Sequence, residues 1–149
     1  MSRIIINGSH QLNGNTSRLI QQLFPNTSSL NLLDYNIEIY NYNETYSDCD
    51  QFISIIEEII QYEEIIFATP VYWYAMSSLM KIFFDRITDL LHSNNQLGYQ
   101  LKNKNIQVVT SSNGNHLDEI FFEPFKETCK YLEMHFIKGS HYVNPISQV

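Results

Sequence analysis

The chain has 149 residues, of which 44% are hydrophobic and 17% charged, and its formal net charge is −7. This length and balance predict one folded domain over residues 1–149 and exclude an intrinsically disordered chain. The acidic charge argues against nucleic acid or an anionic membrane as the partner, because both are bound by fields of Lys and Arg. No apolar run is long enough for a signal-peptide core or a membrane span, so we expect a cytoplasmic protein.

Short apolar runs alternate with amphipathic stretches from one end of the chain to the other. The apolar runs predict five strands, at residues 3–7, 29–33, 64–69, 105–111 and 135–143. Apolar residues at helical spacing predict four helices between them, at residues 15–24, 52–60, 77–91 and 124–134, with Asp50 as the cap of the second. This alternation predicts a doubly wound α/β fold, with a parallel sheet and helices on both faces.

Parallel strands point their carboxyl ends toward one edge of the sheet, and ligands of doubly wound proteins bind beyond that edge. Three segments follow predicted strands there, at residues 8–17, 70–75 and 111–116. These three segments are therefore the candidate binding loops.

The first loop, residues 8–17, joins a strand to a helix and contains Gly8 and Gly14. Glycines permit a tight turn, and the N-terminus of the helix offers unpaired N–H groups, so the loop can cradle a phosphate. Its sequence does not match the Walker A pattern or the dinucleotide fingerprint GxGxxG, and it has no lysine for a nucleoside triphosphate. The alternative interpretation is that Asn15 and Thr16 are merely helix caps and turn formers.

The second loop, residues 70–75, places Tyr72, Trp73 and Tyr74 directly after a predicted buried strand. Adjacent side chains point in different directions, so the three rings cannot all lie in the core. Aromatic surface at the carboxyl end of a strand suits a flat, fused-ring ligand. The alternative is that one or two of these rings cover the helix that follows.

Two segments, GSHQLNGNTSRL and ATPVYWYAMSSLMKIFFDR, together resemble the NAD(P)H-dependent FMN reductase family of flavodoxin-like proteins. In that family the first segment reads GSPRxxGNTxxL and the second PVYWxxxxxxLKxFxDR, each between a strand and a helix. The order of strands and helices also agrees over nearly the whole chain. The resemblance implies a flavodoxin-like three-layer sandwich whose five-stranded parallel sheet has the order 2-1-3-4-5.

The resemblance also implies FMN as the cofactor, NAD(P)H as the co-substrate, and a set of binding residues. Residues of the first loop would surround the FMN phosphate, residues of the second would line the isoalloxazine ring, and the loop after the fourth strand would complete the site. The residues are Ser9, Gln11, Asn15, Thr16 and Ser17, then Pro70, Val71, Tyr72, Trp73 and Tyr74, and then Ser111, Asn113 and Gly114. No catalytic side chain is implied, since the flavin itself carries the reaction.

Two departures from the family pattern affect these expectations. His10 and Gln11 stand where the family has Pro-Arg, so a cationic contact to the phosphate is missing unless Arg18 replaces it. The chain ends soon after the fifth strand, so we expect the last helix of the family to be missing. A second subunit would then cover that face of the sheet, and we expect a homodimer.

The remaining reactive residues fit structural roles. Asp85 and Arg86 match the helix that follows the second loop in the family, and we expect them to form a structural or interface ion pair. The two cysteines, Cys49 and Cys129, form no CxxC pair, and the histidines lack metal-ligand spacing. We therefore expect no disulfide framework, no metal site and no iron–sulfur cluster.

Two functions from different classes fit the sequence. The first is an FMN-dependent oxidoreductase that passes hydride equivalents from NAD(P)H to a small acceptor, which is a flavin, quinone, nitro or azo compound. The second is a non-enzymatic module, either a flavodoxin-like electron carrier or a flavodoxin-fold domain that has lost tight FMN binding. The chain is short and acidic, as flavodoxins are, but its PVYW segment resembles the reductases, and we favour the oxidoreductase on that segment.

Overall fold

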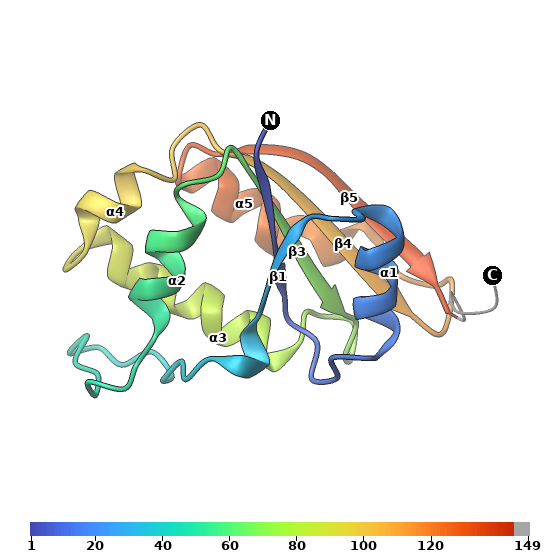
Figure 1. The fold of residues 1–149 in the computed structure, drawn as a ribbon, viewed down its shortest axis with the longest axis horizontal. Coiled ribbons are helices and arrows are strands. Elements are labelled where there is room, and N and C mark those ends of the chain that lie inside the picture. Colours follow the sequence, from blue (N-terminus) through green and yellow to red (C-terminus); the bar gives the residue numbers. More distant parts are fainter. Residues whose placement is uncertain (145–149) are drawn as a thin grey trace.

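A computed structural model describes residues 1–144 of the chain (Figure 1). Five parallel strands form one sheet in the order β2-β1-β3-β4-β5. They are β1 (Arg3–Asn7), β2 (Ser28–Asn31), β3 (Glu64–Pro70), β4 (Asn105–Ser112) and β5 (His135–Val143). This confirms the flavodoxin-like strand order that the sequence predicts. The order reverses between β1 and β3, so the loops after these two strands flank the switch point of the sheet.

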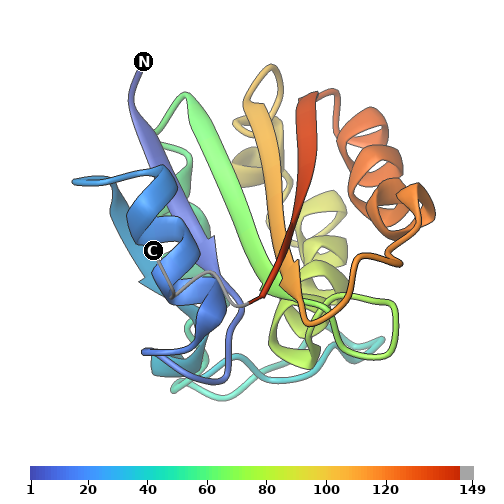
Figure 2. The same ribbon diagram turned by 90° about the vertical axis from the view of Figure 1, so that its right-hand side faces the viewer.

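Helices cover both faces of the sheet, as Figure 2 shows, with α1 on one face and α2, α3 and α5 on the other. The α-helices are α1 (Asn15–Leu23), α2 (Phe52–Ile59), α3 (Ser78–Arg86), α4 (Asn95–Tyr99) and α5 (Glu123–Tyr131). Three short 3-10 helices are η1 (Leu32–Asp34), η2 (Ile87–Leu91) and η3 (Glu119–Phe122).

Alternation along the strands divides the apolar side chains between two cores. Ile4 and Ile6 of β1 face the larger core, which contains the apolar stripes of α2, α3 and α5. Ile5 lies between them in the sequence and faces the other way, where it packs with Leu19 and Ile20 of α1. Runs of buried β-branched residues such as this are typical of parallel strands that are covered on both faces.

The third predicted helix, residues 77–91, is divided in two. The α-helix ends at Arg86, and the next five residues form η2. A 3-10 helix aligns residues three apart, and this turn brings Asp89 Oδ2 to 2.7 Å from Arg86 Nε. The change of helix type therefore goes together with an ion pair that the hydrophobic pattern does not reveal.

Other element boundaries also differ from the predictions. The predicted helix 124–134 ends at Tyr131, because Glu133 has a positive φ of 55° through which a helix cannot continue. The predicted strand 29–33 is the shorter Ser28–Asn31, and η1 follows it. α4, η1 and η3 were not predicted, because each is too short to show a hydrophobic period.

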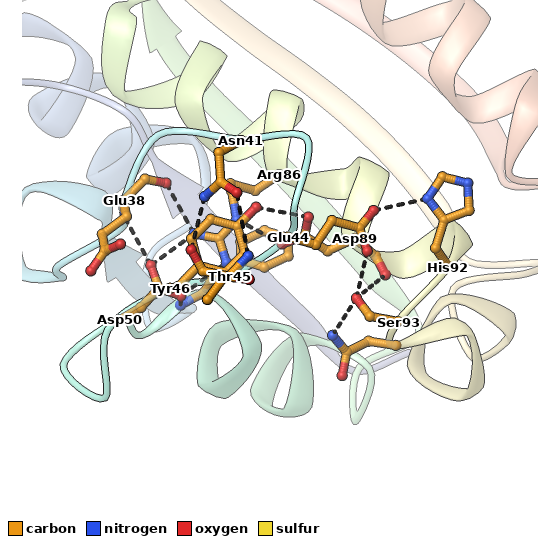
Figure 3. Close-up of polar contacts among 12 residues, drawn as sticks. Glu38, Asn41, Glu44, Thr45, Tyr46, Asp50, Arg86, Asp89, His92 and Ser93 are labelled. Carbon is orange, nitrogen blue, oxygen red and sulfur yellow. Dashed lines mark hydrogen bonds and ion pairs between the residues drawn. The ribbon is translucent and has the colours of Figure 1, made fainter.

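The side chain of Arg86 is buried, with 1% of its surface exposed. Its guanidinium donates to both carboxylate oxygens of Asp50, at 2.7 and 2.9 Å, and its Nε donates to Asp89 (Figure 3). The group also lies between two aromatic rings, with its central carbon 3.4 Å from the Tyr46 centroid and 4.8 Å from the Phe52 centroid. Planar stacking and paired hydrogen bonds of this kind require arginine and could not be supplied by lysine.

These contacts correct the expectation for Asp85 and Arg86. Asp85 makes an exposed ion pair one turn earlier on α3, while Arg86 binds the tyrosine-rich loop, residues 35–51. Its hydrogen bonds to Asp50 and to the carbonyl oxygen of Glu38 attach the two ends of that loop to α3. The N-cap of α2 is Gln51, so the prediction of Asp50 as the cap is wrong by one residue. Asp50 is chiefly a partner of Arg86, and it also accepts from Phe52 N at 3.3 Å.

Electrostatics within this cluster fix the protonation of two more groups. Burial alone would raise the pKa of Asp50, but its hydrogen bonds with Arg86 hold the pKa below its ordinary value. Tyr46 donates to Asp89 Oδ1 at 3.0 Å, and burial together with this bond raises the pKa of Tyr46 to about 12. Asp50 is therefore charged, and Tyr46 neutral, at any ordinary pH.

Replacement of Arg86 by Ala is expected to lower the free energy of unfolding by about 3–5 kcal/mol, because Asp50 and Asp89 would stay buried without a counter-charge. Urea unfolding monitored by circular dichroism measures the loss. The matched control is Lys81→Ala, which removes an exposed ion pair and should cost less than about 1 kcal/mol. Equal effects of the two variants would contradict the assignment.

β5 ends at Val143, and everything after Asn144 lies outside the described residues. The predicted absence of a further helix therefore stays a prediction. Between residues 1 and 144, no helix has both the length and the apolar character needed to cross a membrane.

Candidate functional site

The loops after β1, β3 and β4, termed the first, second and third loops, are joined to one another at the carboxyl edge of the sheet. Thr16 Oγ1, in the first turn of α1 after the first loop, lies 3.1 Å from Ser111 Oγ at the end of β4. Val71 N, in the second loop, donates to the carbonyl oxygen of Ser111 at 3.1 Å. Ser77 caps α3 and also donates to the carbonyl oxygen of Gly8 at 2.6 Å, which ties the second loop to the first.

A hollow of about 200 Å³ lies between the three loops, and it is termed the polar hollow. Its walls combine residues that the sequence predicts for the cofactor site with three others. The predicted residues are Ser9, Gln11, Asn15, Thr16, Pro70, Val71, Tyr72, Ser111 and Asn113, and the others are Gly14, Ser112 and Asn144. Residues that are far apart in the sequence therefore share one cavity.

The wall that the first loop and α1 form is rich in hydrogen-bond donors. Asn15 and Thr16 line the hollow and are the first residues of α1, whose N-cap is Gly14. No side chain of residues 1–144 makes a capping hydrogen bond to this helix, so the N–H groups of its first turn are available to a ligand, and the helix dipole favours an anion there. Along the described chain no Lys or Arg lines the hollow, and Arg18 is exposed outside it.

Two predicted hydroxyl groups shape the first loop from within. Ser9 Oγ donates to the carbonyl oxygen of Gln11 at 3.0 Å, and Ser17 Oγ donates to the same oxygen at 3.2 Å. Asn7, at the end of β1, accepts from Ser9 N and donates to Ser17 Oγ, both at 3.1 Å. Ser17 does not line the polar hollow that the described residues form, so it supports the loop from the side facing away.

A second hollow, of about 280 Å³, adjoins the first and is termed the aromatic hollow. The two hollows share Val71, Ser112 and Asn113. The other residues that line the aromatic hollow are Trp73, Tyr74, Gly114 and His116. Trp73 is 92% exposed and Tyr74 is 64% exposed, so neither ring belongs to the core. The edge of the sheet therefore presents a polar hollow directly beside open aromatic surface.

The aromatic residues of the second loop form a strained two-residue turn. Tyr72 N donates to the carbonyl oxygen of Ala75 at 2.9 Å, and Ala75 N donates back to that of Tyr72 at 3.2 Å. Between them, Trp73 and Tyr74 have positive φ angles of 49° and 66°. A turn with two positive φ angles is the type I′ turn, which favours Asn-Gly, so Trp and Tyr adopt it at a cost in stability. Such strain is typical of ligand sites.

Replacement of Trp73-Tyr74 by Asn-Gly is expected to raise the free energy of unfolding by about 1–3 kcal/mol, because the new residues tolerate positive φ. The same change is expected to weaken binding of any flat ligand in the aromatic hollow. Urea unfolding measures the first effect and ligand titration the second. The control is Tyr74→Phe, which keeps the strained backbone and should leave the free energy of unfolding unchanged. If the Asn-Gly variant were less stable than the wild type, the turn would not be strained.

Two residues of the site, Asn7 and Asn144, lie outside the three loop segments that the sequence predicts, although a signal existed for both. Asn144 directly follows β5, so the rule that ligands bind beyond strand ends could have included it. Its N–H donates to the carbonyl oxygen of Ser112 at 2.7 Å, and its Nδ2 donates to Asn113 Oδ1 at 3.1 Å. Asn7 is a polar residue at the end of an apolar strand, and such a placement could have indicated that its side chain binds the loop that follows.

Other hollows of the surface are larger, but their chemistry is less specific. One of about 380 Å³ lies beside α1, and one of about 300 Å³ lies beside α4. Volume by itself does not identify a ligand site, whereas available helix N–H groups and a strained aromatic turn in one place do indicate one. Through Asn144, no group of three or more His, Cys, Asp or Glu side chains is placed to hold a metal ion.

The strand order and this edge define the chain as a flavodoxin-like α/β protein with a polar hollow beside an open aromatic surface. The model of the NADPH-dependent FMN reductase family matches residues 1–146, and the chain belongs to that family.

Similar proteins agree with this family. Over 42 residues the chain is 50% identical to a Bacillus subtilis protein provisionally named NAD(P)H-dependent FMN-containing oxidoreductase YwqN, a match that spans 28% of this chain and 23% of that relative. The chain thus covers under a quarter of that relative's length.

Solved structures share the fold at low sequence identity. The Trp repressor binding protein of Bacillus subtilis has a TM-score of 0.72 at 23% identity, over 96% of this chain and 84% of that one. A NADPH-quinone reductase of P. pentosaceus has a TM-score of 0.67 at 19% identity, over 97% and 89% of the two chains. General stress protein 14 of Treponema denticola, solved in complex with FMN, has a TM-score of 0.69 at 16% identity, over 96% and 86%.

Proposed function

We propose that the chain binds FMN at the carboxyl edge of its sheet and uses it as an NAD(P)H-dependent oxidoreductase. The observation that carries this proposal is the pairing of two unlike hollows across shared residues. The polar hollow offers N–H groups of α1 to a phosphate, and the aromatic hollow offers flat apolar surface to a fused ring system. FMN has a phosphate at one end and a fused ring system at the other, so it fits both.

The proposed binding residues fall into two groups, according to the part of the cofactor that each group would contact. Gln11, Asn15 and Thr16 would bind the phosphate, and Ser9 and Ser17 would hold the loop that does so. The remaining residues would line the ring and its polar edge: Pro70, Val71, Tyr72, Trp73, Tyr74, Ser111, Asn113 and Gly114. Among the described residues no Lys or Arg lines the polar hollow, so we expect only moderate affinity for the phosphate.

When bound, the flavin would accept hydride from NAD(P)H and pass it to a small acceptor. The chain would therefore need only to hold the flavin in position and to provide a suitable electrostatic environment. The chain's own residues hold the ring at the edge of the sheet and leave surface open beside it. The exposure of Trp73 and Tyr74 leaves room for a planar nicotinamide or acceptor to approach. We propose a flavin, quinone, nitro or azo compound as that acceptor.

A flavodoxin-like electron carrier is the alternative, and the net charge of −7 favours it. Stepwise reduction of the FMN-loaded protein separates the two functions. A stable blue semiquinone would support the carrier. Oxidation of NAD(P)H with a flavin, quinone, nitro or azo acceptor would support the oxidoreductase, and its absence across that panel would overturn it.

FMN titration of the purified chain tests the cofactor site directly. Saturable quenching of flavin fluorescence at one flavin per chain is expected, together with quenching of Trp73, the single tryptophan of the chain. Gln11→Arg should tighten binding about tenfold or more, because a charge-assisted hydrogen bond to the phosphate replaces a neutral contact. This gain should shrink with added salt.

Gln22→Arg is the matched control for that titration. It adds the same charge on an exposed position in the last turn of α1, away from the polar hollow, and should leave FMN affinity nearly unchanged. No saturable binding to the wild-type chain would overturn the cofactor assignment. Equal gains from both arginines would instead indicate a general effect of charge.

We also propose a homodimer that covers the face of the sheet on which α1 lies. Gln107 and Glu64 share that face, where Gln107 Nε2 donates to Glu64 Oε1 at 2.6 Å. Gln107 Oε1 is buried yet accepts no hydrogen bond from a residue of the described chain. Lys138 is exposed and is the register partner of Gln107 on β5, so in a symmetric pair the lysine of one copy can reach the acceptors of the other.

Sedimentation velocity tests this assembly. Wild-type protein is expected to sediment at about twice the chain mass of 17.5 kDa. Lys138→Glu should give the monomer, since it places like charges beside Glu64. Lys130→Glu, an exposed position on α5, is the control and should leave the dimer intact; a monomeric wild type would contradict the proposal.

A further inference from the structure

Asparagine precedes three of the five glycines of the chain, and all three pairs lie in or next to the first and third loops. They are Asn7-Gly8, Asn13-Gly14 and Asn113-Gly114. An asparagine before a glycine can deamidate without an enzyme, because a residue with no Cβ lets its backbone nitrogen approach the side-chain amide of the residue before it. The three pairs share this chemistry, so their surroundings decide which of them reacts.

Hydrogen bonds hold the first two pairs in place. Gly8 N donates to a carbonyl oxygen of β3 at 2.8 Å, and Asn7 is buried with three hydrogen bonds to its side-chain amide. Gly14 N donates to the carbonyl oxygen of Gln11 at 3.2 Å. A backbone nitrogen that donates a hydrogen bond must give up that bond before it can react, so both pairs are protected.

The pair in the third loop lacks this protection. Along the chain as far as Asn144, no residue accepts a hydrogen bond from Gly114 N. Asn113 is exposed, and its Oδ1 accepts from Asn144 Nδ2 at 3.1 Å. A donor at this oxygen stabilises the negative charge that the oxygen takes on when the adjacent carbon is attacked. The Asn113 amide is therefore both accessible and polarised.

The imidazole of His116 places a base beside the same pair. A Cβ atom on residue 114 would overlap Nδ1 and Cε1 of the His116 ring, so the ring lies directly against the backbone of Gly114. An edge-to-face contact with Tyr74, with the centroids 5.9 Å apart, holds the ring there. A neutral imidazole has one nitrogen that can accept a proton. The nearest atoms beside the other two glycines belong to methionine, serine and glutamine residues, which are not bases.

We propose that Asn113-Gly114 is a site of spontaneous deamidation, promoted by His116, that places a negative charge where the two hollows meet. His116 takes the proton of Gly114 N as this nitrogen attacks Asn113 Cγ. The new N–C bond forms, the bond from Cγ to the side-chain nitrogen breaks, and ammonia leaves with the transferred proton. Water then opens the cyclic imide at one of its two carbonyl groups, which gives aspartate or isoaspartate without any oxidation or reduction.

The new charge would arise at a sensitive position. Asn113 lines both hollows, and among the described residues no Asp or Glu lines either of them. FMN is an anion, so a carboxylate at this position would oppose its binding. Isoaspartate also lengthens the backbone by a methylene group, which would displace Gly114 from its hydrogen bond with Ser112. The effect on FMN rests on the proposed function, whereas the deamidation itself does not.

Incubation of the folded chain without FMN, in mildly alkaline buffer at physiological temperature, tests the modification. Tandem mass spectrometry of proteolytic peptides locates each deamidated asparagine. We expect Asn113 to react fastest, Asn13 several-fold more slowly and Asn7 slowest. In guanidinium the unfolded chain should deamidate at similar rates at all three positions, because the folded surroundings are lost. If Asn113 reacted no faster than Asn13 in the folded chain, the inference would be overturned.

His116→Phe tests the base. This variant keeps an aromatic ring beside Tyr74 but removes the proton acceptor, so deamidation at Asn113 should slow several-fold. The rate at Asn13 in the same sample should stay unchanged. His135→Phe makes the same change at the start of β5, at the opposite edge of the sheet, and should behave as wild type. Equal rates at Asn113 in His116→Phe and in the wild type would overturn the role of His116.

FMN titration of charge variants tests the consequence. Asn113→Asp reproduces the charge and should weaken FMN binding about tenfold. Asn103→Asp adds the same charge at an exposed position before β4, at the opposite edge of the sheet, and should leave the affinity unchanged. If the wild-type chain bound no FMN, the cofactor proposal would fail while the deamidation rates still tested this inference. Equally tight binding by Asn113→Asp and the wild type would overturn the effect of the charge.

Discussion

Parallel strand pairing is the constraint on which the rest of the molecule depends. Parallel neighbours cannot be joined by a short turn, so each connection crosses a face of the sheet and returns to the same edge. The carboxyl ends of β1, β3 and β4 therefore meet, and the three loops after them need no other device to come together. The position of the site follows from topology, and side-chain chemistry decides what the site can bind.

That chemistry relies on the backbone more than on charge. Acidic as the chain is, the polar hollow presents backbone donors, because no side chain of the described residues caps α1. The aromatic hollow depends on backbone conformation in a second way, since Trp73 and Tyr74 occupy a turn that favours Asn-Gly. The molecule gives up some stability there, and what it gains is an aromatic surface held outside the core.

Helix α3 connects this site to a second polar cluster. At its start, Ser77 caps the helix and binds the first loop through Gly8. At its end, Arg86 binds the tyrosine-rich loop through Asp50 and through the backbone of Glu38. A helix that is fixed at both ends is a rigid support, so the second loop, which leads into it, begins from a defined position.

The sequence by itself determined the number of strands and their alternation with helices, because buried parallel strands need continuous apolar runs and helices need a 3.6-residue period. The order of the strands in the sheet came from the family resemblance. It also determined which loops lie at the ligand edge, since that follows from the strand–helix order. Only the tertiary structure decided the partners of Arg86, the break after α3, the support role of Ser17 and the placement of His116 against Gly114. Each of these features depends on contacts between elements or on local backbone geometry. A hydrophobic period indicates which face of an element is buried, but it does not indicate which residues pack against that face.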